Sequence, residues 1–280
     1  MRPTEATLAA AAQALGRDAL PWFIAALLAL LAVVGLAGWM LLRHARRRGA
    51  ERVISVADLA VRLGLGFVVI VVAALLVATL AEAVEAGKVL GRIDVILSAT
   101  VGQSTPGPVR QVFAWLTHLG DPVTLAIVGI VVAVILLNLG ERSLAACWIV
   151  ALAGNAVLNP VLKRVFERAR PVHDQAVALA DGWSFPSGHS SGSVIAYGML
   201  AYVVIRTGPR SWHLPALLAA TAIAFTTGCS RIFLQVHYAT DVVAGFASGI
   251  AWLAICIGSL EAASHYRRRR ARRVGHRPRP

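Results

Sequence analysis

Long apolar runs recur along the chain, separated by short polar or Gly/Pro-containing connections. A transmembrane α-helix needs roughly 20 consecutive apolar residues to cross the hydrocarbon layer. Seven runs approach this length, at residues 21–42, 63–81, 121–138, 143–161, 188–206, 214–230 and 239–259. The alternating pattern of a membrane barrel does not occur, and backbone groups in lipid must be bonded within the spanning structure. The pattern therefore predicts an all-α, polytopic transmembrane bundle of about seven spans.

Three regions follow from this pattern. Residues 1–62 are expected to form an anchor span and a basic loop, residues 63–262 a six-span membrane-embedded core, and residues 263–280 an Arg-rich tail. The first apolar run is followed by an Arg cluster and not by a small-residue cleavage site, so we interpret it as a retained anchor. Within the stretch 82–120, residues 109–119 are expected to lie as a helix on the membrane surface, and this stretch indicates no chemistry.

Composition agrees with a bilayer environment. Hydrophobic residues make up 58% of the 280 positions, mean hydropathy is +0.69, and only 15% of residues are charged. The net charge of +13 is concentrated in residues 43–62 and in the tail from Arg267. Basic residues beside apolar spans fix orientation and bind anionic lipid headgroups. We therefore expect anionic lipids as partners of this loop and tail, and no nucleic acid.

The basic segments also predict orientation. If the loop 43–62 and the tail are cytoplasmic, seven spans place the N-terminus outside. The same count places the connections 82–120, 162–187 and 231–238 on the extracytoplasmic face. The three cysteines, Cys147, Cys229 and Cys256, lie in or beside apolar runs without metal-binding spacing, so we interpret them as packing residues.

Ionisable residues gather at the ends of several predicted spans. Placing a charge there costs free energy, so these residues are candidates for function. The run KRVFERARP follows the fourth span and includes Lys163 and Arg170. If the helix continued, these two cations would share one face and suit a multiply charged oxyanion. A basic cap at the end of a span is the alternative interpretation of this run alone.

Two further groups lie on the same predicted face. The run PSGH places Ser187, Gly188 and His189 at a helix start, where free N–H groups favour phosphate, although a polar cap is the alternative. The third run carries Arg231, His237 and Asp241. The last two are four residues apart, so the carboxylate can hold one ring nitrogen while the other attacks a substrate, although such a pair can also be purely structural.

Together the runs KRVFERARP, PSGH and SRIFLQVHYATD resemble the three-part signature of the type 2 phosphatidic acid phosphatase superfamily. This superfamily includes bacterial lipid phosphatases, glucose-6-phosphatases and vanadium haloperoxidases. Every signature position is matched, and the resemblance covers roughly residues 63–260. It implies an integral protein of a bacterial inner membrane that hydrolyses a lipid phosphate or diphosphate at the extracytoplasmic face.

The resemblance also implies residue roles. His237 would attack phosphorus and form a phosphohistidine, with Asp241 holding its ring and His189 protonating the leaving oxygen. The remaining signature residues would bind the phosphoryl oxygens: Lys163, Arg170, Ser187, Gly188 and Arg231. We expect no cofactor and no metal, because three cations would neutralise the phosphoryl group and no carboxylate cluster suits Mg²⁺.

Other functions remain open at this stage. The same residues would serve a lipid-to-lipid phosphotransferase, whereas seven apolar spans make a soluble haloperoxidase improbable. A protein that only binds or transports lipid phosphates would need neither His189 nor His237.

Overall fold

The computed structural model describes residues 3–47, 56–85, 88–171 and 182–275, and its regular structure in these ranges is entirely helical. The elements are α1 (Pro3–Arg17), α2 (Ala19–Arg47), α3 (Val56–Ala83), α4 (Val89–Ser104), α5 (Gly107–Leu116), η1 (Thr117–Gly120), α6 (Pro122–Asn138), α7 (Arg142–Phe166), α8 (Gly188–Thr207), η2 (Arg210–Trp212), α9 (His213–Phe233) and α10 (Ala239–Gly275). The expected all-α fold is confirmed.

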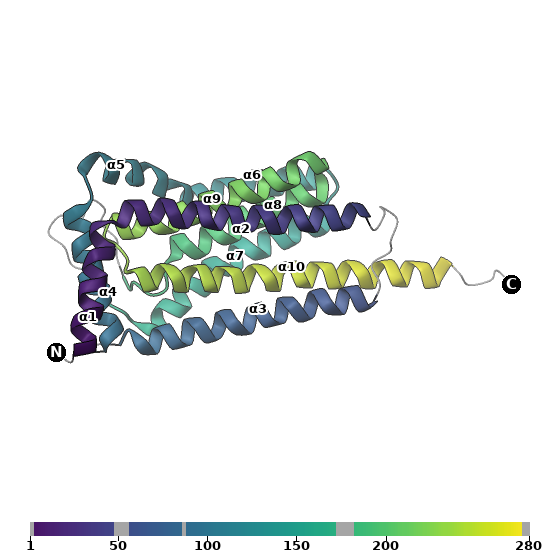
Figure 1. Ribbon diagram of the computed structural model, residues 1–280. Helices are drawn as coiled ribbons and strands as arrows, with labels where there is room; N and C mark the ends of the chain where they lie inside the picture. The colour runs from purple at the N-terminus through teal and green to yellow at the C-terminus, as the bar shows by residue number, and fades with distance from the viewer. Residues whose placement is uncertain (1–2, 48–55, 86–87, 172–181, 276–280) are drawn as a thin grey trace.

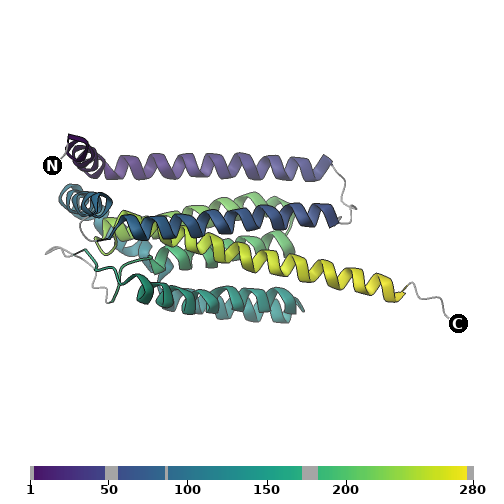
Figure 2. The same cartoon turned by 90° about the horizontal axis from the view of Figure 1, so that it is seen from below.

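The long helices α2, α3 and α6 to α10 run along one common axis (Figures 1 and 2). The short helices α1 and α4 lie across one end of this bundle, at the opposite end from the last turns of α10. Helix α10 continues past residue 263, so no break in structure separates the predicted core from the Arg-rich tail. Residues 48–55 of the basic loop and 276–280 of the tail lie outside the described residues.

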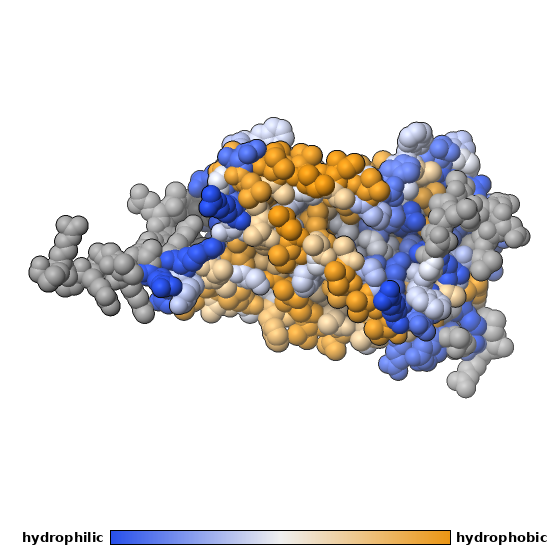
Figure 3. Space-filling model, turned by 180° about the vertical axis from the view of Figure 1, so that it is seen from behind, coloured by the Kyte–Doolittle hydropathy of each residue, from blue (hydrophilic) through white to orange (hydrophobic). Residues whose placement is uncertain are grey.

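The outer surface of the bundle is suited to lipid. Large apolar side chains such as Phe67 and Val123 are 66% and 70% exposed. On the face shown in Figure 3, an apolar band is bounded by hydrophilic residues toward both ends of the molecule. A monomeric protein in water rarely exposes so large an apolar surface. The bundle therefore belongs in a membrane.

Helix length and composition bear on the number of membrane spans. A helix forms in each of the seven predicted segments. Within the described residues, five helices are long and apolar enough to cross a membrane, and six if the bent pair Gly107–Gly120 and Pro122–Asn138 counts as one span. Helix α8 is not among the five because serines and glycines occupy its first turns. The count of seven stays a prediction.

Small residues allow α8 and α10 to pack closely at the end that carries α1 and α4. A Cβ atom added at Gly245 would lie 2.5 Å from the backbone oxygen of Ser187, and one at Gly249 would lie 2.9 Å from that of Ser191. Small residues four apart are a common means of close helix packing in membranes. This contact sets the position of the first turn of α8.

Helix α1 fixes α4 against the end of the bundle. Ser104 Oγ donates to the carbonyl of Gly16 at 2.7 Å, and Arg92 pairs with Glu5 at 3.1 Å. On its other side, α4 accepts a hydrogen bond from Gln235 Nε2 at the carbonyl of Ser98. Gln235 belongs to the α9–α10 connection, so α4 is tied directly to the loop that carries His237.

Candidate active site

The three signature runs converge at the end of the bundle that carries α4. Helix α7 ends at Phe166, and Glu167 takes a left-handed conformation with φ 44°. The helix therefore does not continue to Arg170, so the condition under which Lys163 and Arg170 would share one helical face is not met. The chain instead turns at Glu167, and the strap 167–171 carries Arg168 and Arg170 to the α9–α10 connection.

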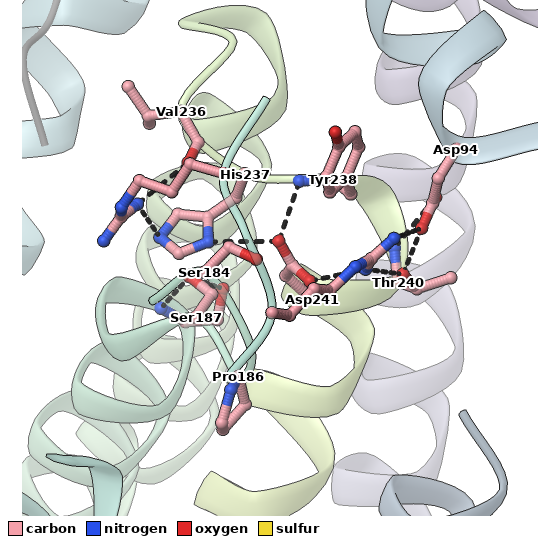
Figure 4. Close-up of polar contacts among 12 residues, drawn as sticks. Asp94, Ser184, Pro186, Ser187, Val236, His237, Tyr238, Thr240 and Asp241 are labelled. Carbon is pink, nitrogen blue, oxygen red and sulfur yellow. Dashed lines mark hydrogen bonds and ion pairs between the residues drawn. The ribbon is translucent and has the colours of Figure 1, made fainter. Parts of the chain in front are cut away.

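His237 and Asp241 form the centre of the site (Figure 4). His237 precedes α10, Asp241 lies in its first turn, and His237 Nδ1 is 3.3 Å from Asp241 Oδ2. Both residues are buried, with exposures of 2% and 0%. The predicted contact is therefore present, although it joins a loop residue to a helix start and not two residues of one helix.

The partners of His237 indicate its tautomer. Arg170 Nη1, which can only donate, lies 3.2 Å from His237 Nε2. Nε2 is therefore the acceptor nitrogen of the neutral ring, and Nδ1 carries the proton toward Asp241. Burial lowers the pKa of His237 to about 4, with Arg170 and Arg231 acting in the same direction and Asp241 against them. At neutral pH the ring is neutral, with its Nε2 lone pair directed toward the cations.

Asp241 is held from several directions. Its Oδ2 accepts from the backbone N–H of Tyr238 at 3.0 Å, and its Oδ1 accepts from Arg168 Nη1 at 2.6 Å. Arg168 also donates to Asp94 of α4 at 2.8 Å. Sequence reasoning assigned no role to Arg168 and no chemistry to residues 82–120, so this part of the site was missed.

His189 lies near a second carboxylate. Its Nε2 is 2.9 Å from Asp121 Oδ1, and His118 Nδ1 is 2.6 Å from the other oxygen of the same carboxylate. Asp121 lies between η1 and α6. A Cβ added at Gly120 would lie 3.1 Å from the His189 ring, so the absence of a side chain there permits this approach. Sequence reasoning also missed Asp121, which carries no local signal beyond its place before Pro122.

Three cations lie near His237 and Asp241. Lys163 interacts electrostatically with Arg170, Arg231 and Asp241, and His237 interacts with both arginines. Arg231, only 6% exposed, donates from Nη1 to Thr117 Oγ1 at 2.8 Å. Its buried Nε meets no hydrogen-bond partner among the residues that the structure describes. This concentration of positive charge and directed donors suits a multiply charged oxyanion.

Ser187 and Gly188 begin α8 as predicted, but the bonds of Ser187 are structural. Its hydroxyl caps the helix through the Ser190 N–H, and its own N–H donates to the Asp241 carbonyl at 3.0 Å. These bonds join the start of α8 to the start of α10. A phosphate contact from Ser187 or Gly188 stays a prediction.

The predicted site residues thus gather at one end of the bundle. His173, Asp174 and Asp181 of the connection before α8 lie outside the described residues. Within the described parts of the chain, no three His, Cys, Asp or Glu side chains form a group able to hold a metal ion.

Comparison with known proteins identifies the class. The family model of the PAP2 superfamily matches residues 144–264. Phosphatidylglycerophosphatase B of Bacillus subtilis (strain 168) is 30% identical over 189 residues, which are 61% of this chain and 84% of that protein. The chain belongs to the PAP2 superfamily, and it is an integral membrane phosphatase of this type. The resemblance found in the three signature runs is confirmed.

Two further relatives agree. The crystal structure of a transmembrane PAP2 type phosphatidylglycerolphosphate phosphatase from Bacillus subtilis matches with a TM-score of 0.64 at 28% identity, covering 69% of this chain and 96% of that one. A probable lipid phosphate phosphatase beta of Arabidopsis thaliana is 29% identical over 132 residues, which are 39% of this chain and 62% of that protein. The family model begins at residue 144, so Asp94, Thr117 and Asp121 lie outside its match.

Proposed function

We propose that this protein hydrolyses a lipid phosphate at the extracytoplasmic face of a bacterial inner membrane, through a phosphohistidine formed on His237. The observation that carries the proposal is the arrangement around His237. Its Nδ1 faces Asp241, and its Nε2 faces Arg170 among three cations. A neutral imidazole in this orientation can act as a nucleophile, because its Nε2 lone pair points to the place where the cations would hold a phosphate group.

The reaction then has two balanced steps. In the first step the lone pair of His237 Nε2 attacks phosphorus, the bond to the lipid oxygen breaks, and that oxygen takes a proton from His189. In the second step His189 accepts a proton from water, whose oxygen attacks phosphorus, and the P–N bond breaks to release phosphate. Asp241 stabilises the positive charge that the phosphorylated ring carries.

The cations would stabilise the negative charge of the phosphoryl group during transfer. Phosphoryl transfer depends mainly on positioning and on charge stabilisation, and Arg170, Arg231 and Lys163 offer both. We expect activity to persist in EDTA and to be inhibited by orthovanadate, which can adopt the five-coordinate geometry of the transition state. Loss of activity in EDTA that Mg²⁺ restores would contradict the metal-free mechanism.

The position of the site supports a lipid substrate. The signature residues lie at one end of the bundle, and the face shown in Figure 3 carries an apolar band with hydrophilic residues toward both ends. In a bilayer such an end lies close to the lipid headgroups. Two relatives are named for phosphatidylglycerophosphate or phosphatidylglycerolphosphate, and one for lipid phosphate in general. Phosphatidylglycerol phosphate is therefore the first substrate to test, followed by phosphatidic acid and a polyprenyl diphosphate.

The decisive experiment replaces the nucleophile. His237→Ala should abolish phosphate release from every lipid in the panel, because water cannot replace the imidazole in the same geometry. His44→Ala is the matched control, since His44 is exposed near the end of α2. Mass spectrometry of enzyme quenched during turnover should find the phosphate on His237. Phosphate on another residue, or near-normal activity of the His237 variant, would refute the proposal.

A further inference from the structure

Arg168 has a place in the site that differs from those of the other arginines. Its Nη1 donates to Asp241 Oδ1 at 2.6 Å and to Thr240 Oγ1 at 2.7 Å. Its Nη2 donates to Asp94 Oδ2 at 2.8 Å, and its guanidinium carbon lies 4.3 Å from the centre of the Tyr238 ring. These contacts direct the guanidinium toward carboxylates and not toward the site of the phosphoryl group.

These contacts link Asp241 to Arg168 and Arg168 to Asp94, on the side of Asp241 opposite to His237. In Figure 4, Asp241 lies between His237 on one side and the pair of Thr240 and Asp94 on the other. The Asp94 side chain is 3% exposed, that of Asp241 is fully buried, and that of Arg168 is 12% exposed. Two carboxylates buried this deeply need a cation between them, because like charges repel strongly when water is excluded.

Each carboxylate oxygen of Asp241 has its own set of partners. Arg168 holds Oδ1, whereas Oδ2 accepts from the Tyr238 N–H and faces His237. The carboxylate cannot rotate about its last bond without losing a charge-assisted hydrogen bond. The direction of Oδ2 sets the direction of the His237 ring, and hence that of the attacking lone pair.

Asp94 fixes Arg168 in turn. It lies on α4, which α1 holds across the end of the bundle, and it also accepts from the hydroxyl of Thr240. Burial raises the pKa of Asp94, whereas its bonds from Thr240 and Arg168 act in the opposite direction. Arg168 thus supplies the positive charge that offsets the burial of Asp94.

We propose that Arg168 is a positioning residue that holds Asp241, and through it His237, in the geometry for attack on phosphorus, with Asp94 as its anchor. The inference rests on the proposed role of His237 as nucleophile. The two arginines of the strap 167–171 then have different roles. Arg170 faces the reacting nitrogen, and Arg168 braces the carboxylate behind it.

The test compares three arginines of the same run. Arg168→Met should lower kcat by roughly 10- to 100-fold, as loss of a supporting partner typically does. It should leave KM and the inhibition constant of orthovanadate unchanged, because the anion contacts remain. Arg170→Met should raise both constants. Arg164→Met is the matched control, since Arg164 is exposed on the last turn of α7, and it should behave as wild type.

A second variant separates positioning from stability. Without Arg168, Asp94 and Asp241 face each other with no cation between them, so Arg168→Met is expected to melt at a lower temperature. The double variant Arg168→Met/Asp94→Asn removes this repulsion and should recover the melting temperature in detergent. Its kcat should stay low, because Asp241 Oδ1 still lacks the Arg168 Nη1 donor.

The outcomes are distinguishable. A double variant that recovers both melting temperature and kcat would show a purely structural ion cluster and overturn the proposal. A rise in KM and in the vanadate constant equal to that of Arg170→Met would make Arg168 a phosphate ligand and also overturn it. Activity retained by His237→Ala in the same assays would instead refute the proposed function, whatever the Arg168 variants do.

Discussion

At the scale of single residues, the environment of His237 predicts its titration. Its pKa is lowered to about 4 because burial disfavours the charged ring. A histidine in an unfolded chain takes up a proton near pH 6.5. Between these two values the unfolded state binds more protons than the folded state, so the contribution of His237 to stability is lost as pH falls through this window.

This titration can be measured directly. In enzyme labelled with ¹⁵N in its imidazole rings and held in detergent, the resonance that disappears in His237→Gln should remain that of a neutral ring at pH 5.5. Its protonated nitrogen should be Nδ1, the nitrogen that faces Asp241. A midpoint near pH 6.5 would mean that the ring is exposed to solvent, in conflict with its burial.

Asp121 allows a separate test of His189 as the proton donor. The carboxylate fixes the orientation of the His189 ring. Asp121→Asn should lower kcat by about tenfold or more for a lipid phosphate, whose alkoxide needs a proton to leave. For p-nitrophenyl phosphate, whose leaving group needs none, the decrease should be much smaller.

The control for this variant is His118→Ala, which removes the outer histidine and keeps the contact between Asp121 and His189. His118 has a 63% exposed side chain, so its loss should have the smaller effect. Equal decreases for both substrates in Asp121→Asn would argue that Asp121 acts on folding or on phosphate binding and not on proton donation.

At the scale of helices, the contact between α8 and α10 determines whether the site forms. Gly245→Ala would place a Cβ atom 2.5 Å from a backbone oxygen at the start of α8, so the helices must move apart. Because the Ser187 N–H donates to the Asp241 carbonyl at this point, the movement separates two of the three signature runs. We expect lower kcat together with a lower melting temperature.

Gly64→Ala provides the comparison, because no atom lies within 4 Å of a Cβ added at that position of α3. Alanine favours helix over glycine, so this variant should melt at the same or a slightly higher temperature and keep its activity. Wild-type activity and stability in Gly245→Ala would show that the first turn of α8 tolerates displacement.

At the scale of the whole molecule, orientation in the membrane is the main expectation still to be tested. Helix α5 lies at the end that carries the signature residues, and η2 lies in the α8–α9 connection (Figure 1). In a background without Cys147, Cys229 and Cys256, a cysteine at exposed Gln111 should react with an impermeant thiol reagent added outside intact cells. A cysteine at exposed Ser211 should react only after the cells are opened.

The reverse labelling pattern would place the site in the cytoplasm and change the pool of lipids available to it. Labelling of both positions from outside would mean that one of the three helices between them, α6, α7 or α8, does not cross the membrane. That result would also revise the count of seven spans.

The sequence alone determined the class of fold and the residues of the signature, because both depend on local information. Apolar runs of sufficient length specify helices in lipid, since backbone groups must be bonded within each segment. Lys163, His189, Arg231, His237 and Asp241 stand at the ends of such runs, where a charge is costly enough to indicate function.

Only the tertiary structure decided what supports these residues. Asp94 and Asp121 lie in or beside a connection between predicted spans, where a single acid is typical of solvent exposure and indicates no function. They reach the site because α1 holds α4 across the bundle and because Gly120 allows η1 to approach α8. Arg168 faces Asp241 because α7 ends at Glu167. Such contacts between residues about 70 positions apart depend on packing, which no short stretch of sequence records.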